Sequence, residues 1–523
     1  MSLGPRRAGR ALAVLALVGA GAVPAATAAS PGRSVSVIVV PRFSPAAYAE
    51  RGAVGLLVPG AGSTVTRAGA LSSLVRGRVE SSLLGGTAKG RPLIRLARRP
   101  GAITIYVSLP RTGRSRNLSR YPIAVVGGGY QGLLTSRSTR IPGLVSIADV
   151  APSAVALRQG RAPTIRSRSS SDAPGTLVRL DAQLRDTHDA RTAGIVVLVA
   201  SVLTLAGLAQ LLRSALFARA ALLAIPSALA VSFGLAAAGI DGLWPATLAL
   251  ALGTLGLSLA AARRARALLP LLLGFLVAAV VALELWPAVN ALSVIGPHPD
   301  GGGRYFGVTN EVETLLLAPV LAAGALAGTR RLPLVALLAL LVVGWSRTGA
   351  DGGGVLVVLA ALGALWSIRE GLRWTPGRLV VAALGAVGIG LLAVGVDVVS
   401  GGSSHVTHSL GRGPWALARE LGHRLQISWA GVTATWQAGI AAASMLGVLA
   451  GLGLRRERSD VVDALLIALA VSLLVNDSPT DVIAYGALVG GALRTWDGLD
   501  FAMRERRTVR AYVQQGSPML LRR

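Results

Sequence analysis

Acidic, basic and hydroxyl side chains gather in four short segments of this 523-residue chain, each beside a strongly apolar stretch. The first segment, 296–319, reads GPHPDGGGRYFGVTNEVETLLLAP. The other three, SRTGADGGG, SHVTHSLGR and NDSPTD, begin at residues 346, 404 and 476. Ionisable groups next to apolar runs of membrane length are costly unless they face protein or water, so they mark function by default.

The residue types in these segments suit acid–base chemistry on a phosphorylated or carboxylated substrate. Carboxylates act as general bases, and we expect Glu311, Asp351 or Asp477 to have that catalytic role. Arginine recognises phosphate and carboxylate through paired hydrogen bonds, and histidine moves protons near neutral pH. The substrate-binding residues that we expect are Arg304, Tyr305, Asn310, Arg347, His405, Arg412, Asn476 and Ser478.

The same residues also have plainer interpretations, which stay open. Acids in the first turn of a helix are stabilised by the helix dipole, so Glu311, Glu313 and Asp481 are equally interpretable as helix caps. The spacing of His405 and His408 suits a metal site, but no carboxylate motif accompanies the pair. The sequence also contains no HExxH, P-loop or GxSxG motif, so metal and cofactor stay unassigned.

The elements that must position these residues are membrane helices. The chain is 52% hydrophobic with a mean hydropathy of +0.60, which is too apolar for an ordinary soluble domain. It contains no cysteine, which excludes disulfides, thiolate nucleophiles and Cys-ligated metals. Eleven segments have spanning length or close to it: 194–212, 220–240, 243–262, 267–289, 308–328, 332–346, 354–368, 379–399, 427–453, 461–476 and 481–494.

Arginine placement predicts the topology of these spans. If the polar block before residue 193 is outside, every predicted cytoplasmic loop is rich in arginine, as the positive-inside rule requires. This topology also explains much of the net charge of +28 without nucleic acid as a partner. It places all four polar segments on the outer side. The inner arginines are Arg213, Arg219, Arg263, Arg264, Arg266, Arg330, Arg331, Arg369, Arg373, Arg378, Arg455, Arg456, Arg458, Arg494, Arg504, Arg506 and Arg507.

Four parts follow from this organisation. Residues 1–29 combine arginines, a short apolar run and small residues, which is typical of a secretory signal peptide, the alternative being an N-terminal membrane helix. Residues 30–190 form an exported α/β domain, with strands at 35–40, 53–58, 102–109 and 122–128, helices near 66–84 and 151–159, and a basic, Ser-rich linker or edge loop at 160–180. Residues 193–496 form the polytopic transmembrane bundle, and residues 497–523 a basic cytoplasmic tail.

The exported domain resembles the alkaline phosphatase superfamily in three stretches. Residues 132–160 are similar to the closing part of such domains, residues 35–45 to the first strand, and residues 52–69 to the region that holds the nucleophile. The resemblance implies a phosphatase-like fold.

The sequence departs from the superfamily's catalytic pattern. Active members end the first strand with a metal-binding Asp, where this chain has Pro41; Ser63 or Thr64 stands near the nucleophile position. No Asp–His pair precedes residue 132, and His188 is the only histidine of the domain. Because metal-assisted phosphoryl chemistry needs such ligands, the resemblance implies a degenerate, inactive domain.

The four polar segments also resemble motifs of a family of uncharacterised bacterial multi-pass membrane proteins, which carry the same kind of degenerate phosphatase-like ectodomain. Those motifs are GARYYGIGNEYMG, GANFGG, SHIGR and NDSG. This chain departs from them at NEVE, which replaces NEYM, and at Pro479, which replaces Gly. The matching residues are Arg304, Tyr305, Gly307, Asn310, Glu311, Asp351, His405, Arg412, Asn476, Asp477 and Ser478.

Three functions are consistent with these features. We expect a multi-pass protein of the plasma membrane and cell envelope whose outward-facing site handles a lipid-linked or phosphorylated substrate. The second hypothesis is a non-catalytic scaffold, because residues 30–190 carry 23 basic against 7 acidic residues and suit an anionic lipid or envelope polymer as partner. The third is a transporter or flippase, although the acids Glu284, Asp397 and Asp463 all lie near predicted span ends.

Overall fold

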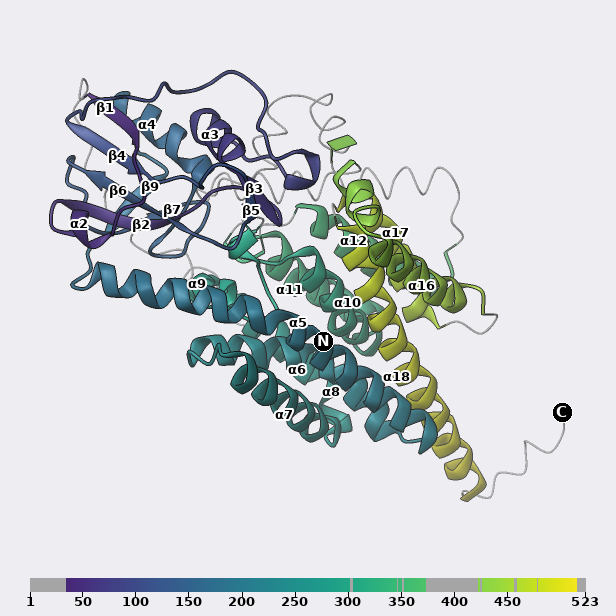
Figure 1. The fold of residues 1–523 in the computed structure, drawn as a ribbon. Coiled ribbons are helices and arrows are strands. Elements are labelled where there is room, and N and C mark those ends of the chain that lie inside the picture. Colours follow the sequence, from purple (N-terminus) through teal and green to yellow (C-terminus); the bar gives the residue numbers. More distant parts are fainter. Residues whose placement is uncertain are drawn as a thin grey trace, which may run out of the picture.

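The computed structural model describes residues 34–301, 304–345, 347–349, 352–372, 422–423, 426–455, 459–476 and 478–514, without the side chains of Asp300 and residues 500–514. Within these residues the chain forms an α/β domain seated on one end of a helical bundle (Figure 1). The predicted signal segment and the predicted span 379–399 lie outside the described residues.

A seven-stranded mixed sheet forms the centre of the α/β domain. Its strands are β1 (Val35–Val39), β2 (Gly52–Val58), β4 (Ile103–Val107), β6 (Tyr121–Val126), β7 (Gly132–Ser136), β8 (Leu144–Ser146) and β9 (Ile165–Arg168). The order is β1-β4-β6-β2-β7-β9, and β8 pairs with β2. All seven residues of β2 are buried because helices cover both faces of the sheet. The four strands predicted from the sequence are confirmed as β1, β2, β4 and β6.

Helices on the two sheet faces make this a three-layer domain. Helices α3 (Arg67–Arg76) and α4 (Val150–Arg158) pack on one face, in a core with β1, β4 and β6. The other face packs against α2 (Ala46–Ala49) and the first half of α5 (Ala173–Leu211). A separate two-stranded antiparallel sheet, β3 (Thr64–Thr66) with β5 (Arg114–Arg116), lies beside α3.

Helix α5 joins the domain to the bundle as one continuous element. Its buried Leu177, Leu180 and Leu184 pack on the sheet, while Leu198, Val202 and Leu205 belong to the bundle core. The prediction of a linker or edge loop at 160–180 is therefore wrong as to its structure: the stretch contains β9, which lies at the edge of the sheet, and the start of α5. Leucines at helical spacing bury that stretch despite its charged neighbours.

Apolar helices form the bundle. Its members after α5 are α6 (Ala215–Ala237), α7 (Leu243–Ala262), α8 (Leu268–Leu285), α10 (Asn310–Ala327), α11 (Leu332–Gly344), α12 (Gly352–Arg369), α16 (Trp436–Gly453), α17 (Asp460–Val475) and α18 (Pro479–Gln514). Among the described residues, seven helical segments are long and apolar enough to cross a membrane. They are Ala173–Leu211, Ala215–Ala237, Leu243–Ala262, Ala265–Leu285, Asn310–Ala327, Gly352–Arg369 and Trp436–Gly453.

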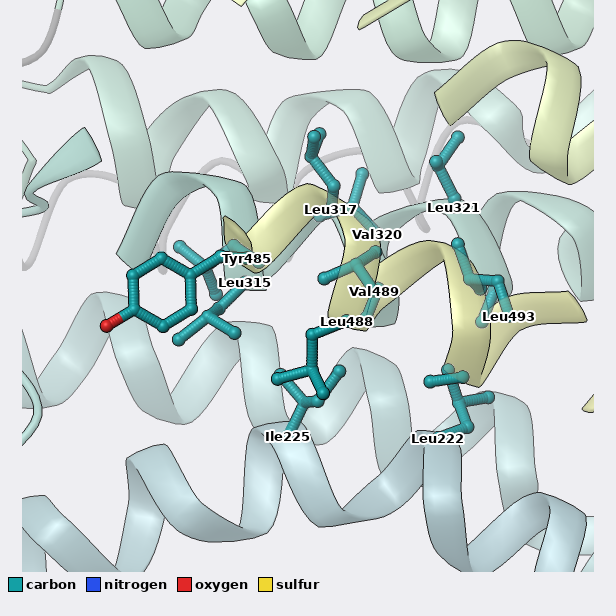
Figure 2. Close-up of a cluster of buried hydrophobic side chains, with 14 of the residues drawn as sticks. Leu222, Ile225, Leu315, Leu317, Val320, Leu321, Tyr485, Leu488, Val489 and Leu493 are labelled. Atoms are coloured by element: carbon teal, nitrogen blue, oxygen red, sulfur yellow. The ribbon is translucent and has the colours of Figure 1, made fainter. Parts of the chain in front are cut away.

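Helix α10 lies at the centre of the bundle. Figure 2 shows its Leu315, Leu317, Val320 and Leu321 in one cluster with side chains of α6 and α18, which contribute Leu222, Ile225, Tyr485, Leu488, Val489 and Leu493. Helices in a membrane are held together chiefly by close van der Waals packing of this kind, so the cluster fixes the position of α10. The polar residues at its first turn are fixed with it.

Candidate functional site

The predicted site residues lie at the bundle end that contacts the α/β domain. Arg304, Tyr305, Asn310, Glu311, Arg347, Asn476 and Ser478 are described there, on or beside the first turns of α10, α12 and α18. The remaining predicted residues, Asp351, Asp477, His405 and Arg412, lie outside the described residues. The structure thus brings together three of the four polar segments.

Hydrogen bonds between polar groups of residues 304–312 hold the loop before α10 in a defined conformation. Thr309 caps the helix, its hydroxyl accepting from the backbone N–H of Val312 at 3.3 Å. The Arg304 guanidinium donates to the carbonyl of Val308. Gly307 has φ +84°, and a Cβ there would lie 2.4 Å from the Gly349 carbonyl oxygen, so only glycine fits.

A histidine–carboxylate pair lies at the start of α10. The Nε2 atom of His298 is 3.1 Å from Oε1 of Glu311. The Glu311 side chain is 12% exposed, whereas that of His298 is 43% exposed. The carboxylate therefore orients the ring, and the imidazole can still be reached from solvent. A carboxylate-oriented, solvent-reachable imidazole has the geometry of a general acid or base.

Glu313, two residues further along α10, is buried instead. It is 1% exposed, and the side-chain amide of Asn476 donates to its Oε2 at 3.1 Å. The same amide donates to the Ser472 hydroxyl at 2.8 Å. Gly354, in the first turn of α12, lies so close that an added Cβ would be 3.1 Å from the Glu313 carboxylate. The first turns of α10 and α12 and the α17–α18 connection therefore meet at Glu313.

Arg347 pairs with the only acid of α8. Its NH1 lies 3.0 Å from Oε1 of Glu284, and the two side chains are 39% and 18% exposed. The segment that carries Arg347 is attached to the loop before α10, since the N–H of Val308 donates to the Gly349 carbonyl at 3.3 Å. The segments at 304–313 and 347–349 thus form one polar unit.

Tyr305 points into the α/β domain rather than toward solvent. It is 8% exposed and hydrogen bonds to the Ser146 hydroxyl, near Asp149. Burial raises the pKa of Tyr305 well above its ordinary value, so the phenol stays protonated. Tyr305 is therefore part of the contact between the domain and the bundle.

Further contacts complete this junction. Arg140 of the domain lies over the Phe306 ring at 3.8 Å and donates to the Arg347 carbonyl at 3.1 Å. The side-chain amide of Asn117, itself 1% exposed, donates to the Gly301 carbonyl at 3.2 Å. The domain thus touches the loop that carries His298 and leads to Glu311 in the first turn of α10.

Residues 60–66 also lie at this junction, since the N–H of Gly62 donates to the Gly301 carbonyl at 2.9 Å. Thr64, Glu80 and Arg114 line a pocket of about 160 Å³ beside the first turn of α3. The guanidinium of Arg114 donates to the Thr64 hydroxyl at 3.2 Å. Across the described residues, no group of three or more His, Cys, Asp or Glu side chains is arranged to hold a metal ion.

Three residues of the site stand outside the predicted set: His298, Glu284 and Glu313. Each is a polar residue near the end of a predicted span, so the sequence predicts its position in the bundle. The partner of each residue could not be read from the sequence, because the pairs join residues 13, 63 and 163 positions apart.

Comparison with protein-family models, curated proteins and solved structures gives no match to this chain.

Proposed function

We propose that this chain is a multi-pass protein of the cell envelope whose outward-facing polar site acts on a lipid-linked or phosphorylated substrate. A membrane location is supported by the seven apolar helices. Ten of the eleven predicted spans coincide with helices, three of them short or partly charged. Arg219, Arg330 and Arg369 lie at helix ends opposite the α/β domain, which supports placing that domain outside.

The observation that carries the proposal is the His298–Glu311 pair. Glu311 Oε1 accepts from Nε2–H of His298, and this leaves Nδ1 as the basic nitrogen. With its ring 43% exposed, His298 can remove a proton from a water molecule or a substrate hydroxyl that attacks a phosphate ester. The carboxylate stabilises the imidazolium that forms, and the same proton is then available to the leaving group.

The other polar residues receive distinct roles in this proposal. Arg347 is part-exposed and offers a guanidinium to a phosphate, although binding requires it to share or leave Glu284. Arg304 and Tyr305 act through the fold, because one closes the loop and the other is buried against Ser146. We therefore assign them as positioning residues.

A scaffold function is the second candidate, and a specific set of contacts favours it. Glu284, Arg347, Arg140 and Phe306 form a continuous series of contacts from α8 into the α/β domain. In a scaffold this series holds the domain in place, and the exposed His298 side chain is dispensable. The two functions therefore predict different activities for a His298 variant in which the contacts between the domain and the bundle are intact.

The test compares variants in cells that lack the native chain. We expect His298→Ala and Glu311→Gln to fail to restore the wild-type profile of envelope lipids while their membrane levels stay normal. Glu370→Gln, at the opposite end of the bundle, is the matched control and restores the profile. A scaffold predicts the reverse pattern: His298→Ala restores the profile, and Arg140→Gln does not.

A further inference from the structure

One loop of the α/β domain concentrates positive charge without counter-ions. Residues 67–116 contain eleven Arg and Lys residues but a single acid, Glu80. Five of these cations lie in the segment 85–101, here called the cationic loop: Lys89, Arg91, Arg95, Arg98 and Arg99. All five side chains are exposed, and within the described part of the chain none has a hydrogen bond or ion pair.

The cationic loop has a fixed path although it contains no helix or strand. The N–H of Leu93 donates to the Val75 carbonyl at 2.8 Å, and the N–H of Ala97 donates to the Val37 carbonyl at 2.9 Å. Ile94 is 3% exposed and anchors the middle of the loop in the domain core. The loop thus runs from the end of α3 to the edge strand β1, and its cations are held outward along that path.

The length and position of this path indicate the ligand. Because the loop passes from the end of α3 at Val75 to β1 at Val37, its five cations are spread along a path and do not surround one point that a single phosphate group could fill. Figure 1 shows the loop crossing the part of the domain farthest from helices α6, α7 and α8. The exposed cations therefore lie on a part of the domain that α6, α7 and α8 do not cover.

We infer that the cationic loop binds a linear polyanion, a chain of repeating phosphate or carboxylate groups. Arginine presents paired donors to either group. The segment 85–101 contains no aromatic residue on which a base could stack, which disfavours single-stranded nucleic acid. This site is separate from the His298–Glu311 pair and does not depend on the proposed function of that pair.

The test uses the full chain in nanodiscs of phosphatidylcholine, with long-chain inorganic polyphosphate as the probe. If each of five cations displaces counter-ions as on a single-stranded polyanion, the log–log slope of affinity against salt is about −3.5. Affinity then falls about 100-fold between about 50 and about 200 mM NaCl. The triple substitution Arg95→Gln, Arg98→Gln and Arg99→Gln reduces the slope to about −1.4. Pyrophosphate competes poorly, because it spans too little of the loop.

A matched control removes three charges from the opposite edge of the sheet. Arg137, Arg161 and Arg168 lie beside or on β9 and are also exposed. Their replacement by Gln leaves the slope at the wild-type value if the cationic loop is the site. Equal losses in both triple variants would mean that only net charge matters and would overturn the inference.

Two further outcomes would also overturn it. Leu93 and Leu96 are exposed within the loop, so a lipid surface is the competing partner. Loop-dependent flotation with phosphatidylglycerol vesicles, without polyphosphate binding, would identify lipid headgroups as the ligand. If the triple variant of the loop binds polyphosphate normally but self-associates, its cations protect the edge of β1 from pairing instead.

Discussion

Replacing Gly354 with alanine tests whether α12 is held against the buried carboxylate of α10. A Cβ on Gly354 would lie 2.4 Å from Cγ1 of Val343 and 3.1 Å from Cδ and Oε2 of Glu313. Carbon atoms pack best at about 3.5–4.0 Å, so the new methyl must displace α11, α12 or the glutamate. Overpacking of this kind costs about 1–3 kcal/mol, and we expect G354A to destabilise the bundle by that amount.

The same helix supplies a matched control. A Cβ on Gly363 would have no neighbour within 4 Å, so alanine fits there without strain. Alanine in a helix interior is about 0.5–1 kcal/mol more favourable than glycine, and G363A should be neutral or stabilising. Two identical substitutions in α12 are therefore expected to change stability in opposite directions.

Thermal unfolding of the detergent-solubilised full chain, followed by tryptophan fluorescence, measures the difference. We expect G354A to unfold at a lower temperature than the wild type, and G363A to unfold at the same or a higher temperature. Adding Val343→Ala to G354A removes the closest contact, so the double variant should lose less stability than the two single losses predict. A G354A protein with wild-type stability would refute the close approach of α12 to Glu313.

Three further predictions concern single side chains. Asn476→Ala removes the amide from a buried carboxylate and should lower stability by about 1–3 kcal/mol in the same unfolding assay, whereas an unchanged value would show that the amide is dispensable. Arg140→Gln removes the ring and carbonyl contacts across the junction, so hydrogen exchange of residues 304–308 should accelerate, while Arg137→Gln leaves it unchanged. Desolvation raises the pKa of Asp241 above 3.8, so the folded state binds the proton of this carboxyl more tightly than the unfolded state does. The free energy of unfolding therefore decreases as the pH rises through the folded-state pKa. Asp241→Asn should therefore raise the unfolding temperature at neutral pH and have no effect below about pH 3.8, and the opposite pH dependence would contradict the shift.

The sequence predicted the α/β domain from its longer strands. Alternating apolar residues in β1, β2, β4 and β6 were sufficient, because each is bounded by turn residues. The strand β8 has three residues and β9 four, too few for a period to be visible. The first half of α5 was missed because its charged residues suggested a linker, although Leu177, Leu180 and Leu184 already had helical spacing.

The site was predictable by position but not by pairing. Apolar run lengths and inner arginines placed the polar segments at one end of the bundle, and Arg304, Glu311, Arg347 and Asn476 do meet there. The sequence could not show that Tyr305 is buried in the α/β domain, since that contact depends on how the domain docks. The number of spans, the residues outside the described ranges and the catalytic roles stay predictions.

The measurement that tests the central claim most directly is native mass spectrometry of the Glu311→Gln protein, extracted with its own lipids. If the His298–Glu311 pair acts on a lipid-linked or phosphorylated substrate, this variant binds that substrate but cannot turn it over. We expect a phosphate-bearing lipid to be retained by Glu311→Gln in higher amount than by the wild type or by Glu370→Gln. Identical bound lipids in all three proteins would contradict a substrate site at this pair and would leave the scaffold as the better account.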